Sequence, residues 1–226
     1  MMTKRIIKYI LIFALIPLLI VGGVIAFGNR SYTFVSMLIA LLGCVPFFLT
    51  FEKSQHNTGK IVILAVMTAL SVAGRFVFAP LPFFKPVTAM VIISAMYFGS
   101  EFGFMVGSLS AVISNFYFGQ GPWTPFQMFC WGIIGFIAGL LSNQLLRSKI
   151  ILVLYGIFSG ILYSLIMDIW TTLWADGVFN ISRFTASVLS SLPIIGIYVV
   201  SNIVFLLLLV PLLSKKILRI KTKYGI

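Results

Sequence analysis

Long apolar runs separated by short polar segments dominate this chain. An α-helix rises about 1.5 Å per residue and the hydrocarbon core of a bilayer is about 30 Å thick, so roughly 20 apolar residues are needed to cross it. Eight runs approach or reach this length, at residues 6–27, 32–51, 61–78, 86–99, 102–118, 126–146, 150–170 and 186–213. The pattern predicts an all-α integral membrane protein, a bundle of about eight transmembrane helices.

Two parts of this pattern leave alternatives open. The fourth and fifth runs are short and are separated only by Ser100 and Glu101, which fits either a tight hairpin or a pair of long, partly buried helices. The first run follows a basic start, as a signal peptide would, but its apolar stretch is long for one and contains Pro17. A retained first helix is therefore the favoured interpretation.

The basic residues indicate how the helices are oriented. If the N-terminus is cytoplasmic and eight spans alternate, twelve of the 16 lysines and arginines fall inside, and only Arg30, Arg75, Lys85 and Arg183 fall outside. The positive-inside rule predicts this asymmetry, so we expect both termini in the cytoplasm. Because the basic residues cluster beside apolar runs, the net charge of +12 is a topology signal and not a nucleic-acid footprint.

Three unusual loops face outward in this orientation. Residues 75–88 contain three prolines, which fix φ and remove backbone donors, so this connection is expected to be stiff. Residues 114–128 combine two glycines with two prolines, and residues 168–183 carry two aspartates and two tryptophans. The sequence therefore places its most distinctive segments on one side of the membrane.

Aromatic and polar residues gather in or beside these loops, including all four tryptophans. An interfacial aromatic belt is the alternative, but a belt occupies both membrane surfaces, so the one-sided set favours an outward cavity with stacking walls and a few polar groups. The predicted substrate-binding residues are Phe84, Lys85, Asn115, Phe116, Gln120, Trp123, Gln127, Trp131, Asp168, Trp170 and Trp174.

Asp168 lies near the outer end of the seventh run. An ionisable side chain at that depth is costly unless it meets water, a cation or a ligand. Its possible cation partners are Arg75, Lys85 and Arg183. A shallow residue that reaches the headgroups is the alternative.

Small residues recur at helical spacing in several runs. Ala65, Ala69 and Ala73 share one face of the third run, where they allow another helix to approach closely. Glycines four residues apart occur at positions 103 and 107, 135 and 139, and 156 and 160. Packing within the bundle explains most of these.

Motifs for catalysis and for self-powered transport are absent from the sequence. It contains no GxxxxGK[ST], HExxH, GxSxG or potassium-channel filter. Cys44 and Cys130 form no ligand set, and His56 stands alone in a polar loop. We therefore expect no enzyme activity and no metal or cofactor held by this chain.

A family resemblance extends these expectations. Residues 85–89 (KPVTA), the glycines at 99, 103 and 107, and residues 114–128 (SNFYFGQGPWTPFQM) resemble the substrate-binding S components of energy-coupling factor (ECF) vitamin transporters. The resemblance covers about residues 61–216 and is most specific at residues 121–125. It implies a six-helix core at 61–216 that binds a vitamin from outside, two extra helices at 1–60, and a basic cytoplasmic tail at 217–226.

The resemblance also implies partners. Ala65 and Ala69, extended by Ala73, match the family's AxxxA motif, which docks on a transmembrane coupling subunit. Two partner ATPases would use the ATP, so this chain would be a non-catalytic transport subunit in a bacterial plasma membrane. Its lipid bilayer and its vitamin would be the other partners, and no nucleic acid is expected.

The overall pattern looks most similar to cobalamin-type S components, and a wide aromatic mouth suits a large ligand. Cobalamin is therefore the predicted vitamin, recognised by shape and hydrogen bonding because no cobalt ligand is evident. Folate, riboflavin or a queuosine precursor are alternatives. A membrane scaffold without transport activity also stays open, whereas an intramembrane enzyme is disfavoured because no general base is evident.

Overall fold

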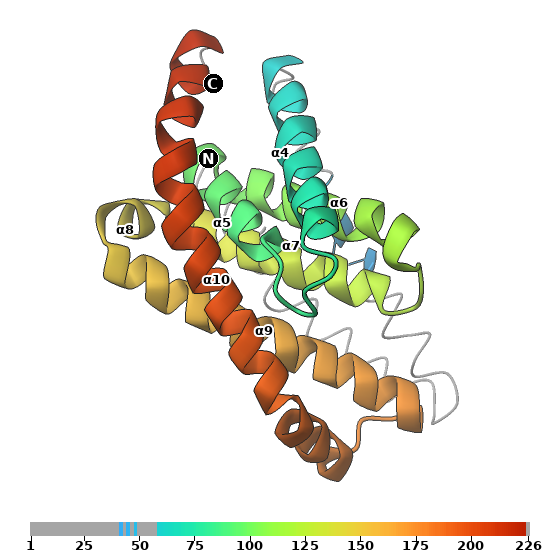
Figure 1. The fold of residues 1–226 in the computed structure, drawn as a ribbon. Coiled ribbons are helices and arrows are strands. Elements are labelled where there is room, and N and C mark those ends of the chain that lie inside the picture. Colours follow the sequence, from blue (N-terminus) through green and yellow to red (C-terminus); the bar gives the residue numbers. More distant parts are fainter. Residues whose placement is uncertain (1–40, 43, 46–47, 49–57, 225–226) are drawn as a thin grey trace, which may run out of the picture.

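The computed structural model of the chain describes residues 41–42, 44–45, 48 and 58–224. From residue 58 onward the elements are α4 (Thr58–Val77), α5 (Val87–Phe98), α6 (Ser100–Phe118), α7 (Thr124–Leu140), α8 (Ser142–Arg147), α9 (Lys149–Asp176) and α10 (Ile181–Tyr224) (Figure 1). The predicted all-helical class is confirmed for this part of the chain. The two N-terminal helices, the eight-span count and the side of both termini fall outside it and stay predictions.

Three of these helices are long and apolar enough to cross a membrane, namely α4, α9 and α10. α5 and α7 are apolar but shorter. The run predicted at 126–146 is not one helix, because α7 ends at Leu140 and α8 begins at Ser142. The basic tail predicted at 217–226 is, as far as Tyr224, the end of α10.

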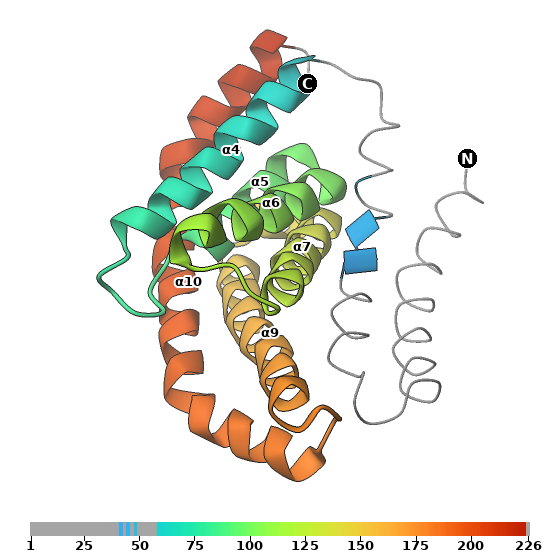
Figure 2. The ribbon, with the colours of Figure 1, turned by 90° about the vertical axis from the view of Figure 1, so that its right-hand side faces the viewer.

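α5 is the central helix of the described bundle. Its residues are apolar around the whole circumference, and every residue from Val87 to Tyr97 is buried. A helix with no polar face is stable only where other elements surround it. α5 contacts α4, α6, α7, α8 and α10, which together enclose it (Figure 2).

A single residue connects α5 to α6. Gly99 has a φ of 99°, which a residue with a side chain adopts only under strain. Its amide donates to the carbonyl of Ala95 and thereby ends α5. Of the two alternatives for the fourth and fifth runs, the tight turn is the one that the structure contains.

Glycines bring α6 and α7 into backbone contact. A Cβ atom on Gly135 would overlap the carbonyl group of Gly103, and a Cβ on Gly107 would overlap the backbone of Trp131. The prediction that these glycine spacings serve internal packing is confirmed at these positions. The close approach also fixes where Trp131 of α7 lies relative to α6.

We predict that Gly135→Ala destabilises the protein, because the new methyl group meets backbone atoms that cannot move aside. Overpacking of this kind costs typically about 1–3 kcal/mol. Thermal unfolding in detergent measures the change. Gly196→Ala is the matched control, since no atom lies within 4 Å of its Cβ position and alanine is the better helix former. Equal stability of Gly135→Ala and the wild-type protein would contradict the packing role.

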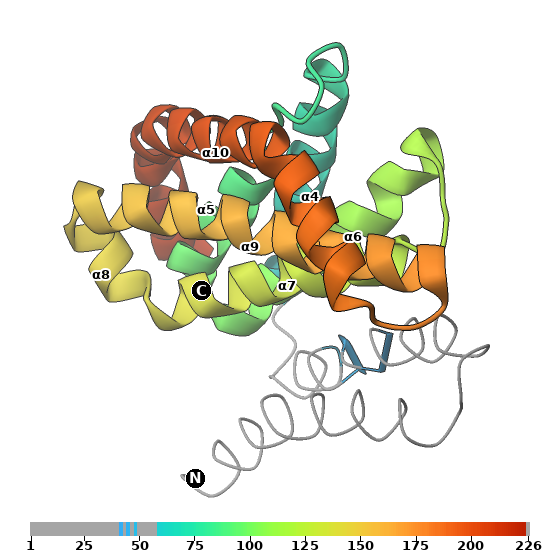
Figure 3. The same cartoon turned by 90° about the horizontal axis from the view of Figure 1, so that it is seen from below.

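α9 and α10 run along each other on one side of the bundle (Figure 3). The side-chain amide of Asn202 donates to the carbonyl of Gly156 at 3.1 Å, and Gly160 also faces α10. α10 changes direction in its first part, which contains Pro193. A proline inside a helix removes one backbone hydrogen bond and permits such a bend.

The connections fall at two opposite ends of the bundle. At one end, Lys221 of α10 donates to the carbonyl of Tyr97 at 2.8 Å, where α5 ends. At the other, Arg75 near the end of α4 bonds to Asn115 near the end of α6. The α4–α5, α6–α7 and α9–α10 connections belong to this second end, which is the end predicted to face outward.

Candidate functional site

A cavity of about 270 Å³ lies among the helices near this second end. Side chains from α4, α5, α7, α9, α10 and the α4–α5 connection line it. They are Arg75, Phe83, Lys85, Val87, Thr88, Gln127, Trp131, Tyr163 and Tyr198. Mostly aromatic walls with a few convergent polar groups are typical of small-molecule sites.

A chain of hydrogen bonds crosses the base of this cavity. Nη1 of Arg75 donates to Oδ1 of Asn115 at 2.8 Å. Nδ2 of Asn115 donates to Oε1 of Gln127 at 2.8 Å, and Nε2 of Gln127 donates to the hydroxyl of Tyr163 at 3.1 Å. Since Asn115 is 1% exposed, it holds Arg75 and Gln127 in place from behind the cavity wall. Residues fixed in this way present a preorganised polar surface.

Aromatic rings form another part of the lining. Trp131 and Tyr163 stack with centroids 5.2 Å apart and an interplanar angle of 22°. Tyr198 meets Tyr163 edge to face at 5.0 Å, and Phe83 meets Tyr198 in the same way at 5.7 Å. These contacts join α7, α9 and α10 through side chains that a flat ligand would also touch.

Phe83 has an unusual backbone conformation. Its φ of 60° lies in the left-handed region, which costs a bulky residue roughly 1–2 kcal/mol. Strained residues of this kind concentrate at functional sites, where the surrounding structure holds them. Here the strain turns the ring of Phe83 onto Tyr198 at the edge of the cavity.

Lys85 ties the α4–α5 connection together. Its ammonium donates to the carbonyls of Phe78, Ala79 and Leu81, the last two at 3.1 and 2.7 Å. An ammonium has three N–H donors, so these bonds use all of them. Burial, and then the neighbouring charge of Arg75, lower the pKa of Lys85. Lys85 therefore adds positive charge to the cavity while its donors hold the loop.

Three of the eleven residues predicted to bind substrate line the cavity: Lys85, Gln127 and Trp131. Asn115 supports it from behind. The ring of Phe84 packs against Phe205 of α10, with centroids 5.1 Å apart. That substrate contacts any of these residues stays a prediction.

The other predicted residues lie away from this cavity. Phe116 is 77% exposed. Gln120 donates to the carbonyl of Val112 and accepts from Thr124 within the α6–α7 connection. Trp170 contacts Phe126 and Trp174 with tilted rings, whose centroids are 5.4 and 5.1 Å away. Trp123 packs beside the same aromatic cluster.

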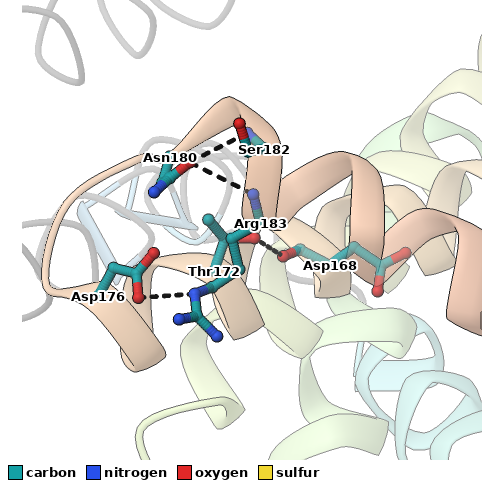
Figure 4. A network of polar contacts seen from close by, with 6 residues as sticks. All are labelled: Asp168, Thr172, Asp176, Asn180, Ser182 and Arg183. Atoms are coloured by element: carbon teal, nitrogen blue, oxygen red, sulfur yellow. Dashed lines mark hydrogen bonds and ion pairs between the residues drawn. The ribbon is translucent and has the colours of Figure 1, made fainter.

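Asp168 has partners that differ from those predicted. Residues 168–176, predicted as part of a loop, are the last turns of α9. The hydroxyls of Ser187 and Ser191 donate to the Asp168 carboxylate at 2.8 Å each, which joins α9 to α10. Arg183 instead pairs with Asp176 at 2.6 Å (Figure 4). Of the three possible cation partners named for Asp168, Arg183 is thus paired with another carboxylate.

Six lining residues are not among the predicted binding residues: Arg75, Phe83, Val87, Thr88, Tyr163 and Tyr198. Arg75 was expected only as a possible partner for Asp168. The tyrosines carried a usable signal, because a phenol hydroxyl in the middle of an apolar run needs a hydrogen-bond partner. Val87 and Thr88 belong to the KPVTA segment of the family resemblance, which did not indicate a role for either residue. Phe83 carried no signal, since its place depends on how the α4–α5 connection folds back.

A second feature, the alanine groove, lies on the outer surface between α4 and α6. Its volume is about 510 Å³, and its lining is Ile61, Leu64, Ala65, Thr68, Ala69, Val72, Ala73, Phe76, Leu109 and Ile113. Ala65, Ala69 and Ala73 are all exposed. The predicted small-residue stripe therefore lies on the surface of the described bundle, where another helix could reach it.

Comparison with known proteins gives one match. A family model described as "ECF-type riboflavin transporter, S component" matches residues 55–219. This range covers well over half of the chain and all the helices that surround the cavity. No curated protein and no solved structure matches.

Proposed function

Because the chain belongs to the family of ECF-type riboflavin transporter S components, we propose that it binds a flat heterocyclic vitamin of the riboflavin class for import. Its fold and family make it a multi-pass membrane subunit for transport. The finer assignments, namely the vitamin, the binding residues and the docking surface, are proposals.

The cavity around Trp131 is the observation that carries this proposal. It combines an aromatic wall with fixed polar groups, and five helices contribute to it. An isoalloxazine or similar ring has two apolar faces and a polar edge, which matches such a lining. Gln127 and Thr88 are the neutral polar residues placed to meet that edge.

Cobalamin fits this cavity less well than a single ring system. A volume of about 270 Å³ lies just below the range of roughly 300–1,000 Å³ for ligand pockets. A corrin macrocycle with its nucleotide loop would require the enclosing helices to separate. The family description also names riboflavin, so the cobalamin prediction gains no support from it.

We further propose that the alanine groove receives the coupling subunit. Helices associate in lipid through close packing of small residues and not through a hydrophobic drive. Exposed alanines along α4 offer such a surface beside the apolar side chains of α6. Partner ATPases would then supply the energy, since this chain has no phosphate-binding loop.

Ligand identification tests the proposed function directly. We expect the chain purified in detergent to retain a small molecule whose mass and visible absorption identify a flavin or a related heterocycle. Uptake in cells should need co-expressed coupling and ATPase subunits. A membrane scaffold would retain no ligand, and ATP-independent uptake by this chain alone would contradict the proposal.

A further inference from the structure

The cavity contains two cations and no carboxylate. Arg75 and Lys85 line it, and its other lining residues are neutral. Burial and, second, the charge of Arg75 lower the pKa of Lys85, so the two cations lie close enough to repel each other. The site therefore has an excess of positive charge that its own residues do not neutralise.

Neither described aspartate forms an ion pair with a cation of the cavity, although the charge of Asp168 reaches Tyr198 in its lining. Asp168 accepts from two serine hydroxyls, and Asp176 pairs with Arg183. Glu101 lies in the first turn of α6, whereas Arg75 contacts Asn115 near the end of that helix. Fourteen residues of helix separate these positions by about 20 Å. Arg75 thus has no counter-ion among the residues that the structure describes.

One nitrogen of the Arg75 guanidinium donates hydrogen bonds to protein, and the other two do not. Nη1 donates to Ser114 and to Asn115, and the group lies over the rings of Phe118 and Trp131, 4.6 and 5.4 Å from their centroids. Nε and Nη2 have no acceptor among the described residues. These two nitrogens share the edge of a guanidinium that binds a carboxylate or phosphate through two parallel hydrogen bonds.

An unpaired, half-buried cation is costly in a membrane protein. The cost is removed if a bound molecule brings the missing negative charge and the two missing acceptors. Lys85 supplies neither, because an ammonium is a cation with donors and no acceptor, and its donors bond to loop carbonyls. Its charge nevertheless strengthens the attraction for an anion.

Building on the proposed function, we propose that the substrate carries an anionic group, a carboxylate or a phosphate, which the Nε and Nη2 edge of Arg75 binds. The ring system of the substrate then lies in the aromatic part of the cavity beside Trp131. This assignment makes Arg75 the residue that distinguishes an anionic vitamin or vitamin phosphate from its neutral analogue.

Two matched pairs of probes test this assignment on the full chain in detergent. Riboflavin and flavin mononucleotide share a ring and differ by a phosphate. Folate and its dimethyl ester differ in two methyl groups, which remove both carboxylate charges. Charge-assisted hydrogen bonds contribute about 1.5–3 kcal/mol, so we expect the anionic member of one pair to bind at least about tenfold tighter. A preference within the riboflavin pair would indicate a phosphate site, and a preference within the folate pair would indicate a carboxylate site.

Arg75→Gln should reduce that preference, the ratio of the two affinities within one protein, to less than about threefold, because glutamine retains a donor but no charge. Any loss of affinity common to both probes cancels in this ratio. Arg147→Gln, at the exposed end of α8, is the matched control and should keep the preference. If Arg75→Gln unfolds below the assay temperature, Arg75→Lys replaces it. The Arg75→Lys variant keeps the charge but has no two-donor edge, so its preference for the anionic probe should be weaker than that of the wild-type protein.

The outcomes separate this inference from the proposed function. Tight riboflavin binding with no preference for either anionic probe would overturn the inference and leave the proposed function standing. If neither pair binds, native mass spectrometry of the molecule retained by the purified protein decides: an anionic molecule supports the inference, and a neutral or cationic one overturns it. A chain that binds no probe and retains no molecule would contradict both.

Discussion

Replacing Ala69 by tryptophan should abolish vitamin uptake and leave ligand binding nearly unchanged. Ala69 is exposed in the middle of the alanine groove, where a large ring would prevent a partner helix from approaching α4. The cavity is lined by other residues, so the variant in detergent should bind the ligand with an affinity within about threefold of the wild-type value. This is less than the tenfold change that corresponds to 1.4 kcal/mol. Uptake by the complete transporter and affinity of the isolated chain are the two measurements.

Val66→Trp is the matched control for this substitution. Val66 is on the same helix and 50% exposed, but it does not line the alanine groove. We expect it to support uptake. If Ala69→Trp and Val66→Trp lower uptake equally, or if Ala69→Trp also loses binding, the groove is not the docking surface.

Trp131→Ala should weaken substrate binding by about 30- to 150-fold, which corresponds to a loss of about 2–3 kcal/mol. Trp131 is 5% exposed and lies between Tyr163 and Arg75. Its removal would take away a stacking surface, for which losses of about 1–3 kcal/mol per ring are typical, and would release both neighbours from their positions. Titration of the purified protein with riboflavin or flavin mononucleotide measures the change.

Trp174→Ala provides the matched comparison, because it removes the same side chain from the aromatic cluster at the end of α9. Trp174 is 58% exposed and does not line the cavity. We expect the Trp174→Ala variant to bind substrate with an affinity within about threefold of the wild-type value. A loss of 1.4 kcal/mol would instead lower the affinity tenfold. The reverse order of effects would move the binding site from the cavity to the Trp170 and Trp174 cluster.

These two experiments probe the two ends of a transport cycle. The cavity proposed for the ligand and the alanine groove proposed for docking share no lining residue. α4 belongs to both, since Arg75 lines the cavity while Ala65, Ala69 and Ala73 line the alanine groove. A change in how α4 packs would therefore reach both sites, which makes this helix a candidate for their coupling.

Much of the fold could be predicted from hydropathy alone. The apolar runs at 61–78 and 150–170 correspond to α4 and to most of α9, because a long apolar run has few stable alternatives to a buried or lipid-facing helix. The helix ends were less predictable. α9 continues past residue 170 to Asp176, since polar and aromatic residues at a membrane interface are compatible with either a helix or a loop.

The candidate site could be predicted only in part. Trp131 and Gln127 follow the specific GPWTP segment and were found, whereas Tyr163 and Tyr198 come from distant helices and were not. Asp168 looked functional because it is an acidic residue near the outer end of an apolar run. In the structure two serine hydroxyls satisfy it, and no sequence pattern distinguishes a carboxylate with such partners from one that awaits a ligand.

The sequence by itself determined that this is a helical membrane protein, where its apolar runs lie, and which face of α4 carries small residues. These properties follow from composition and periodicity along a single helix. Only the tertiary structure decided which side chains surround the cavity, that Lys85 holds a loop, and that Arg75 has an unused donor edge. Such facts depend on which helices lie side by side. Lipid stabilises every apolar helix face about equally, so packing and hydrogen bonds determine which faces contact one another.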